Sequence, residues 1–448
     1  MRAVMPYTDI GETWQKLSLI TGHARRDPDF QFTSLAHLLN VEYLRDCYKS
    51  LNRNKAVGID NVSWEEYGRK LDENLVLLVS KLKRKKYKPI AARRVYIPKS
   101  ETEKRPLGIS ALENKIVERG ITWILESIYE QDFLNCSYGF RPKRNCHQVL
   151  KELNDLIMFQ PVNHIVEADI KGFFDNVSHE KLMESIRIRI KDTTLLNLIE
   201  KFLKAGYVDD GILVKSDTGT PQGSILSPML ANIFLHYVLD TWFETTVKSR
   251  VRGFCEIVRY ADDFVCVVRY AADAKRIERG LQNRFNKYGL EIHSTKSRNI
   301  SFGRFERDNA GTQNRRANTF DFLGFTHYCD RSRKGNFKVG RKTSGKKYSA
   351  KCRAMNTWLK AIRNQVKTKE WWKVLKAKLR GHFQYYGVSE NYNGIVRFYK
   401  FTLRVVRKWM NRRSQKRTMS WVDFTKYLDH YPLPKPKIVH SFYVSPVR

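Results

Sequence analysis

Apolar residues along this chain repeat at two different intervals, which together predict a mixture of helices and strands. Helical spacing is clearest over 112–129, where Ile116, Ile121, Ile124 and Ile128 recur at helical intervals. Other helical stretches lie at 35–51, 179–190, 195–207, 229–243 and 274–289. Short strand-like runs lie at 93–100, 163–170, 255–268, 290–297 and 320–328. Strands intermixed with helices, some of them in antiparallel pairs, predict an α+β fold.

One predicted hairpin carries two adjacent carboxylates. In RYADDFVCVV (259–268), Asp262 and Asp263 stand between two runs that otherwise read as buried strand. Like charges repel, and burying them unpaired is costly. A surface turn accommodates Asp, whereas a divalent cation requires hard oxygen ligands and would offset the repulsion. The dipeptide alone leaves both interpretations open.

A third carboxylate on a neighbouring strand favours the metal site. Asp169 lies late in the apolar run NHIVEADI (163–170), where its side chain can face the tip of an adjacent hairpin. With Asp262 and Asp263 it would form a set able to hold two Mg²⁺ ions about 3.5–4 Å apart. Asp175 is a rival, but it follows the strand and precedes NVSH, so a turn or helix-cap role is favoured there.

The charge balance points to a polyanionic partner. The 448 residues include 82 Lys and Arg against 46 Asp and Glu, a net charge of +36, and such a surplus is typical of nucleic-acid binding. From Arg331 to the C-terminus there are 31 basic and 4 acidic residues. That segment also carries aromatic residues at spacings that allow packed helices, so it predicts a folded basic domain: Trp358, Trp371, Trp372, Tyr385, Tyr386, Trp409 and Trp421.

Several classes of protein are disfavoured. No stretch has the 18 or more apolar residues of a membrane span, and MRAVMPYTDIGETWQ lacks the apolar core of a signal peptide. The seven cysteines form no CxxC pair and no zinc-like spacing with histidine. We therefore expect a reducing compartment, most simply a cytoplasm, and no membrane partner.

Six motifs, including RYADDFVCVV, occur in a fixed order: RRVYIPKSETEKRPLGIS, SYGFRPKRNCH, GTPQGSILSP, RYADDFVCVV, KYGLEIHSTKS and FDFLGFTHY. Together with DIKGFFD they resemble the motifs of reverse transcriptases, and within these the bacterial group II intron-encoded branch. LRGHFQYYGVSENYNGIVRFY resembles that branch's thumb, or maturase, domain. The resemblance covers residues 36–440. Nothing after His440 resembles a zinc-binding or HNH nuclease module, so an endonuclease-lacking type is expected.

The resemblance implies a right-hand polymerase fold with a mostly helical, basic thumb. Its domains would be an N-terminal leader (1–35), fingers with an N-terminal insertion (36–165, with part of the palm near 93–110), a palm (166–330) and the thumb (331–448).

The resemblance also assigns roles around the carboxylates. Asp169, Asp262 and Asp263 match the catalytic metal ligands, with the backbone carbonyl of Ile170 as a further oxygen. Two Mg²⁺ ions would be held, with Mn²⁺ as a substitute. Phe174 matches a steric gate against the nucleotide 2′-hydroxyl, although a core Phe is the alternative. The other residues expected to bind the deoxynucleoside triphosphate (dNTP) are Lys99, Arg105, Gln222 and Lys296. Solvated surface bases are the alternative for Lys99 and Arg105, and a role for Lys296 as proton donor stays open.

Two segments are expected to hold the nucleic acid. Tyr138, Phe140, Arg141 and Arg144 look like template contacts, with bases for phosphates and aromatic rings for stacking. Phe322, Leu323 and Gly324 match the hairpin that grips the primer end, with core packing as the alternative. His382, Tyr385 and Tyr386 are expected in the thumb core.

The expected function is RNA-directed DNA polymerisation, with an RNA template, a DNA or RNA primer and dNTPs as partners. Binding of a group II intron RNA as a splicing maturase, and of target DNA during intron mobility, is also expected. The alternatives are a host-adopted reverse transcriptase in DNA repair or phage defence, and a mainly RNA-binding maturase. A bacterial, nucleoid-associated ribonucleoprotein is the expected setting.

Overall fold

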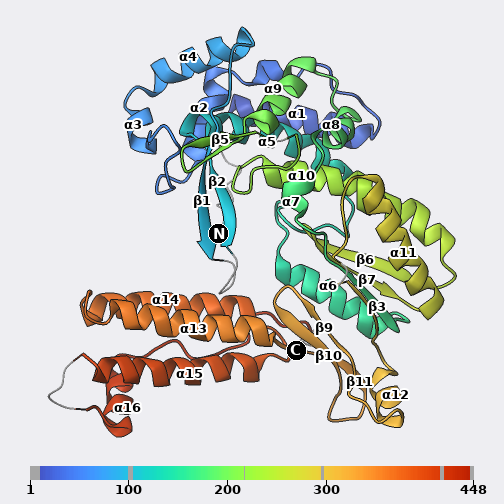
Figure 1. Ribbon diagram of the computed structural model, residues 1–448, viewed down its shortest axis with the longest axis vertical. Coiled ribbons are helices and arrows are strands. Elements are labelled where there is room, and N and C mark those ends of the chain that lie inside the picture. The colour runs from blue at the N-terminus through green and yellow to red at the C-terminus, as the bar shows by residue number, and fades with distance from the viewer. Residues whose placement is uncertain (1–10, 99–103, 216, 294–296, 414–417, 444–448) are drawn as a thin grey trace.

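The computed structural model describes residues 11–98, 104–215, 217–293, 297–413 and 418–443. Helices and strands are intermixed along the chain, as the two apolar periods predict, so the α+β class is confirmed. The described strands form three separate sheets, which lie among the helices (Figure 1). Among the described residues, no helix is both long and apolar enough to span a membrane.

The N-terminal part is a layer of helices around one central helix. α5 (Leu112–Asp132) is buried along most of its length, and α1 (Glu12–Arg26) and α2 (Val41–Ser50) pack against it. α3 (Trp64–Gly68) and α4 (Leu71–Lys83) lie beside α2. Part of the predicted polar leader is therefore folded. Leu17 and Ala24 bury one face of α1, and Trp14 contacts Trp123 of α5 with ring centroids 4.9 Å apart.

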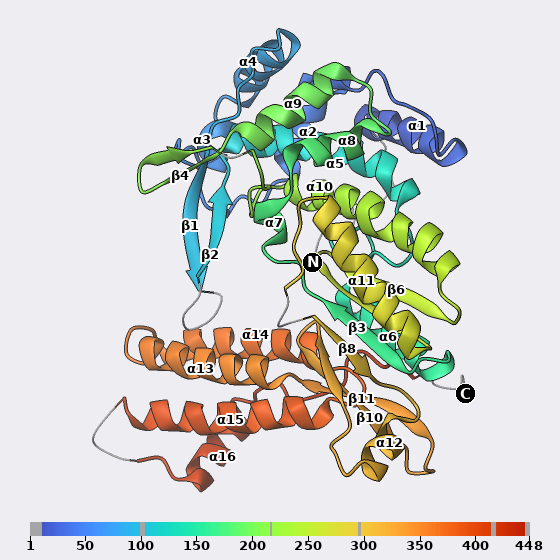
Figure 2. The same ribbon diagram turned by 45° about the vertical axis from the view of Figure 1, so that its right-hand side comes forward.

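Below this layer a four-stranded sheet runs in the order β2-β1-β4-β5. β1 (Ala92–Pro98) pairs with β2 (Lys104–Ile109), and β4 (Tyr207–Asp209) pairs with β5 (Ile212–Val214). The long β1–β2 hairpin projects towards the C-terminal helices (Figure 2). We call this the hairpin sheet.

The central sheet has the order β6-β7-β3-β8, with all neighbours antiparallel. Its strands are β3 (His164–Ala168), β6 (Cys255–Tyr260), β7 (Asp263–Val268) and β8 (Arg298–Ser301). The strand expected at 290–297 is wrong in position: Ile292 makes an isolated bridge to Ile170, and the strand starts at Arg298. Residues 294–296 lie outside the described part.

Helices surround the central sheet. α6 (Cys146–Phe159) packs beside β6, and α11 (Ala271–Lys287) packs against β3. α7 (Phe173–Asn176), α8 (His179–Arg187) and α9 (Thr193–Lys204) follow β3. α10 (Ser227–Leu235) continues as π-helical stretches at His236–Asp240 and Phe243–Val247, which complete the helix predicted at 229–243.

The C-terminal part begins with a third sheet of order β11-β10-β9. β9 (Thr319–Phe322), β10 (Phe325–Arg331) and β11 (Phe337–Thr343) are antiparallel, and α12 (Glu306–Thr312) precedes them. The predicted boundary at 330/331 falls within β10, and the β10–β11 hairpin spans it. The C-terminal helical unit starts with α13 (Gly345–Ile362) and continues with α14 (Thr368–Tyr386), α15 (Tyr392–Asn411) and α16 (Trp421–His430).

Candidate active site

The two adjacent aspartates lie at the turn between β6 and β7. Tyr260 pairs with Asp263, which leaves Ala261 and Asp262 as a two-residue turn. Ala261 has a φ of 58°, in the left-handed region that such tight hairpin turns require. β3 runs beside β7, with Ala168 opposite Phe264. Asp169 therefore leaves β3 at the same edge of the central sheet, as the sequence predicted.

The charges of the three aspartates act on one another. Burial raises the pKa of Asp262, and the charge of Asp169 raises it further. Burial, followed by the charges of Asp262 and Asp169, raises the pKa of Asp263 to about 6, although its side chain keeps contact with solvent. Arg105 lowers both values, and Lys347 of α13 lowers that of Asp263. The edge is thus a concentration of negative charge faced by two bases from other parts of the chain.

The donor set fits hard divalent cations. Among the described residues, no group of three His, Cys, Asp or Glu side chains is already close enough to hold an ion by itself. Mg²⁺ characteristically uses one or two protein carboxylates and takes its other ligands from water and substrate phosphates. The bridge between Ile170 and Ile292 uses the Lys171 amide and the Asp169 carbonyl. It does not use the Ile170 carbonyl, which was predicted as an additional oxygen.

The predicted gate and the predicted nucleotide loop are tied together by their backbones. The amide of Thr220 donates to the carbonyl of Phe174 at 2.7 Å, and that of Gly219 donates to the carbonyl of Val177 at 2.8 Å. Phe173 is buried in the core at 2% exposure, whereas Phe174 is half-buried with its ring edge-on to Phe173. The structure thus distinguishes a core ring from one that reaches the surface.

Gln222 contacts the other end of the same short helix. Its Nε2 donates to both carboxylate oxygens of Asp175 at 3.3 Å. Asp175 is thereby tied to the loop. The Gly108 amide of β2 donates to the Gln222 carbonyl at 2.6 Å. A Cβ at Gly223 would lie 2.6 Å from the Gly108 carbonyl oxygen, so this close approach of the two backbones requires glycine.

Of the three bases predicted to bind the triphosphate, only Arg105 lies within the described residues. Arg105 lies exposed on β2, and its charge acts on Asp262 and Asp263. Lys99 and Lys296 lie outside the described residues. Binding of the triphosphate by Arg105 stays a prediction, and the effect of its charge on the two carboxylates is compatible with it.

The predicted template segment divides into supporting and exposed residues. Arg141 is 6% exposed and donates to Glu130 and to the carbonyls of Leu134 and Ser137. Its guanidinium thus supports the segment from inside, a position that does not favour direct phosphate contact. Phe140 is exposed at 44%.

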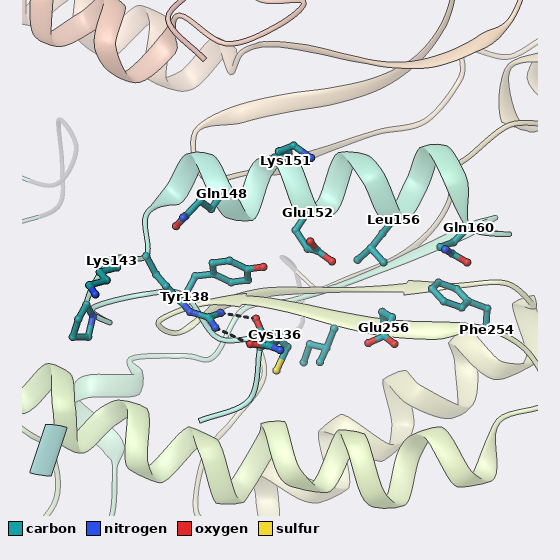
Figure 3. A pocket seen from close by; sticks show the side chains of 14 residues that line it. Cys136, Tyr138, Lys143, Gln148, Lys151, Glu152, Leu156, Gln160, Phe254 and Glu256 are labelled. Carbon is teal, nitrogen blue, oxygen red and sulfur yellow. Dashed lines mark hydrogen bonds between the residues drawn. The ribbon is translucent and has the colours of Figure 1, made fainter. Parts of the chain in front are cut away.

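Tyr138 and Arg144 line a cavity of about 840 Å³ between α6 and β6 (Figure 3). The Arg144 guanidinium lies 4.9 Å from the Tyr138 ring centroid and donates to Asn135. Lys143, Lys151, Glu152 and Glu256 share the cavity wall, so its charge is mixed.

The predicted primer grip is a tight turn held by the C-terminal helical unit. Leu323 and Gly324 have φ values of 48° and 81°. The Tyr385 hydroxyl donates to the Leu323 carbonyl at 2.9 Å, and the Ser344 amide donates to the Gly324 carbonyl at 3.0 Å. Phe322 is buried at 4%, so its ring belongs to the core.

The three aromatic residues expected in the core of the C-terminal unit divide in a similar way. His382 and Tyr386 are buried, at 7% and 5% exposure, and the His382 ring stacks on Phe398 with centroids 3.8 Å apart. Tyr385 is half-buried and reaches the turn at Leu323. The core prediction is confirmed for His382 and Tyr386.

Sequence analysis did not identify three residues near the site. Glu118 of α5 is buried and accepts from the Ile225 amide and the Ser110 hydroxyl at 2.8 and 2.9 Å, which fixes the end of the nucleotide loop. Lys347 approaches Asp263 from α13. Arg259 is fully buried beside the turn. Arg259 could have been identified from the sequence, because a charged residue inside an apolar strand is unusual. Lys347 could not, because exposed lysines are common in this chain.

The sequence of this chain is similar to those of known proteins. A family model described as reverse transcriptase (RNA-dependent DNA polymerase) matches residues 97–327. Group II intron-encoded protein LtrA of Lactococcus lactis subsp. cremoris is 40% identical over 222 residues, which are 49% of this chain and 37% of that protein. Protein YkfC of Escherichia coli (strain K12) is 32% identical over 356 residues, which are 70% of this chain and 88% of that protein.

The chain matches little more than a third of the length of LtrA. Among solved structures, telomerase from Candida albicans in complex with a fragment of telomeric RNA aligns with a TM-score of 0.44 and 14% identity, covering 81% of this chain and 65% of that one.

Proposed function

This chain belongs to the reverse transcriptase family of RNA-dependent DNA polymerases, and from this premise we propose that it is a group II intron-type enzyme that copies RNA into DNA. The observation that carries the proposal is the meeting of Asp169, Asp262 and Asp263 at one edge of the central sheet, with Arg105 facing them. The likeness to LtrA supports the intron type.

In this proposal the three parts of the chain have the roles of a polymerase hand. The central sheet is the palm, the hairpin sheet with the N-terminal helices is the fingers, and the C-terminal helical unit is the thumb. The nucleotide lies between the β6–β7 turn, Phe174 and the Gln222 loop. The primer end rests on the Leu323–Gly324 turn, which Tyr385 fixes from the thumb side.

The residues of this chain orient the reactants and select them. Asp169, Asp262 and Asp263, with the Ile170 carbonyl, would hold two divalent cations, which when bound activate the primer 3′-hydroxyl and stabilise the leaving pyrophosphate. Arg105 offers a guanidinium to triphosphate oxygens. The ring of Phe174 would clash with a 2′-hydroxyl and so favour deoxynucleotides.

The test of this function is extension of a labelled DNA primer on an RNA template by the full chain with dNTPs and Mg²⁺. We expect template-length DNA that depends on the RNA, on the dNTPs and on the cation. A chain that binds the template–primer but adds no nucleotide with Mg²⁺ or Mn²⁺ would contradict the proposal.

A second candidate function is maturase activity, in which the chain stabilises a folded intron RNA. It is favoured by the basic residues exposed along α13, α14 and α15, for example Lys351, Lys373 and Arg404. Its test is splicing of the intron RNA nearest the gene, with and without the protein. A host-adopted enzyme in repair or phage defence would polymerise without accelerating splicing.

A further inference from the structure

Arg259 is a buried arginine in the strand that leads into the aspartate turn. The side chains of Arg259 and Asp240 are both 0% exposed. Nε and Nη2 of Arg259 donate to the two carboxylate oxygens of Asp240 at 2.7 and 2.5 Å. Asp240 ends the π-helical stretch that continues α10. Such a bidentate pair holds the planar guanidinium in one orientation.

The same guanidinium also donates to the turn itself and to two neighbouring segments. Nη1 donates to the carbonyl of Ala261 at 3.0 Å and to Oδ1 of Asn232 at 3.1 Å, and Nη2 donates to the hydroxyl of Ser137 at 2.7 Å. Ala261 is the turn residue with φ of 58° and directly precedes Asp262. Arg259 thus connects the turn to α10, to the π-helical stretch and to the segment at Ser137.

That segment forms a floor beneath the turn. The Arg259 amide donates to the Cys136 carbonyl at 2.8 Å, and the Tyr138 amide donates to the Arg259 carbonyl at 3.0 Å. Nδ2 of Asn232 donates to the Gly139 carbonyl at 2.7 Å. A Cβ at Gly139 would lie 2.3 Å from the Ala261 nitrogen, so the floor touches the turn.

A second buried pair elsewhere in the chain gives a comparison. Arg189 is 1% exposed, lies 3.3 Å from Asp132, and donates to the carbonyls of Ala24 and Asp27 in the N-terminal part. These partners lie in α1, just after α1 and at the end of α5, and not in the β6–β7 turn. Buried ion pairs are weak evidence for a contribution to stability, because apolar residues often replace them without loss. What sets Arg259 apart is its hydrogen bond to the turn.

We propose that Arg259 and Asp240 are positioning residues that fix the Ala261–Asp262 turn, so that the Asp262 carboxylate is held towards Asp169 and Asp263. Neither residue is a catalytic group, because both are buried beneath the turn and act through the Ala261 carbonyl. The inference rests on the proposed role of Asp262 in the polymerase reaction.

The test is the Arg259→Lys variant of the full chain. Lysine keeps the charge and can pair with Asp240, but it lacks the planar fork that also reaches Ala261 and Ser137. Because the loss of a residue that orients a ligand typically costs about 10–100-fold in activity, we expect kcat for primer extension to fall by that factor. KM for dNTP should change less than about twofold, because uniform substrate binding is untouched.

The second readout does not depend on activity. In metal-free protein, hydrogen–deuterium exchange at residues 260–264 should be faster in Arg259→Lys than in wild type, with other core segments unchanged. Arg189→Lys is the matched control: it should lower the melting temperature without changing kcat or exchange at the turn. A wild-type kcat, or unchanged exchange at the turn, in Arg259→Lys would overturn the proposal.

A variant that keeps the ion pair covers the case in which Arg259→Lys does not fold. Ser137→Ala removes one anchor of the guanidinium and leaves Asp240 in place. We expect a fall in kcat of about fivefold, the effect of one hydrogen bond, with faster exchange at the turn; wild-type values would overturn the proposal. The proposed function fails if wild type does not extend primers, or if Asp262→Asn extends them normally. In either case the exchange data still test the positioning role of Arg259.

Discussion

The Thr220 amide donates a 2.7 Å hydrogen bond to the Phe174 carbonyl, so the residue predicted to exclude ribonucleotides and the loop predicted to bind the sugar are joined through their backbones. Gln222 strengthens this connection through Asp175, and Gly108 ties the loop to β2. The predicted gate is therefore connected to β2 of the hairpin sheet through this loop, and to β3 of the central sheet through the chain itself. In the proposed function, selection of the sugar and contact with the triphosphate would then belong to one structural unit.

Phe174→Ala should admit ribonucleotides, because removing the half-buried ring opens space for a 2′-hydroxyl. Competition between dNTP and rNTP in single-nucleotide extension measures the change, and dNTP use should fall less than discrimination does. Phe173→Ala is the matched control. It should cost about 3–5 kcal/mol of unfolding free energy as a core truncation and leave discrimination intact. Loss of discrimination in Phe173→Ala alone would place the gate one residue earlier.

Gly139→Ala should slow catalysis through the floor of the turn. The new Cβ would lie 2.3 Å from the Ala261 nitrogen and must displace the turn that carries Asp262. Because a displacement of about 1 Å can cost on the order of 10²-fold in rate, we expect a kcat loss of that size in primer extension. Gly381→Ala in α14 is the control, since beyond its chain neighbours and the backbone of its own helix no described atom lies within 4 Å of its Cβ position. Equal kcat values for the two variants would contradict the account.

Stability should fall as the pH drops below the ordinary histidine pKa. Burial lowers the pKa values of His236 and His382 to about 4. Both are therefore neutral in the folded chain, whereas the unfolded chain binds protons as the pH falls below 6.5. Stability contributed by the neutral forms is fully present above pH 6.5 and is lost towards pH 4, by up to about 3 kcal/mol per group.

Denaturant unfolding between pH 7 and pH 4.5 measures this loss. His382→Phe should flatten the dependence, because the new side chain does not titrate. Phe383→Leu is the control, and it should lower stability equally at each pH without changing the slope. An identical pH dependence for wild type and His382→Phe would rule out the assignment.

Basic residues on α13 should contribute more to template–primer binding than equal charges on α15. Lys347 acts on Asp263, and Lys351 is exposed one helical turn further along α13. Lys347→Ala/Lys351→Ala should weaken binding and reduce the slope of log affinity against log salt by about 2, or about 1 for each phosphate contact. Lys400→Ala/Arg404→Ala makes the same charge change on α15, in the helical layer farther from the hairpin sheet (Figure 2). Equal slopes for both double variants would contradict this prediction, because they would mean that the basic residues attract nucleic acid without a specific binding face.

Local patterns predicted the parts of the site that neighbouring residues determine. The apolar runs on either side of Asp262 and Asp263 define the hairpin, and the late position of Asp169 in its strand brings it to the same edge. Such inferences succeed because strand register and turn length follow from short-range sequence. The paired rings of Phe173 and Phe174 differ in burial, since Phe173 lies in the core and Phe174 is half-buried, and the gate role of Phe174 stays a prediction.

The features that sequence analysis did not predict depend on contacts between residues that are distant along the chain. Arg141 reads as a phosphate contact among bases and aromatics, yet its guanidinium is used by Glu130 and two carbonyls. The helix at Glu12–Arg26 has a mostly polar sequence and gains its stability by packing on α5. The predicted boundary at 330/331 follows the start of the basic composition, whereas the β10–β11 hairpin spans that point. Amino-acid composition changes along the chain, but it does not indicate which strands pair with one another.

The most direct test of the central claim is the Asp262→Asn variant, assayed for primer extension and for RNA binding in the same preparation. Removing one carboxylate from the set should lower the extension rate by orders of magnitude, because stabilisation of the transition state depends on the cations it holds. RNA affinity should stay within about twofold of wild type, since phosphate contacts supply most of it. Extension at near wild-type rate by Asp262→Asn would contradict the assignment of Asp169, Asp262 and Asp263 as the catalytic site.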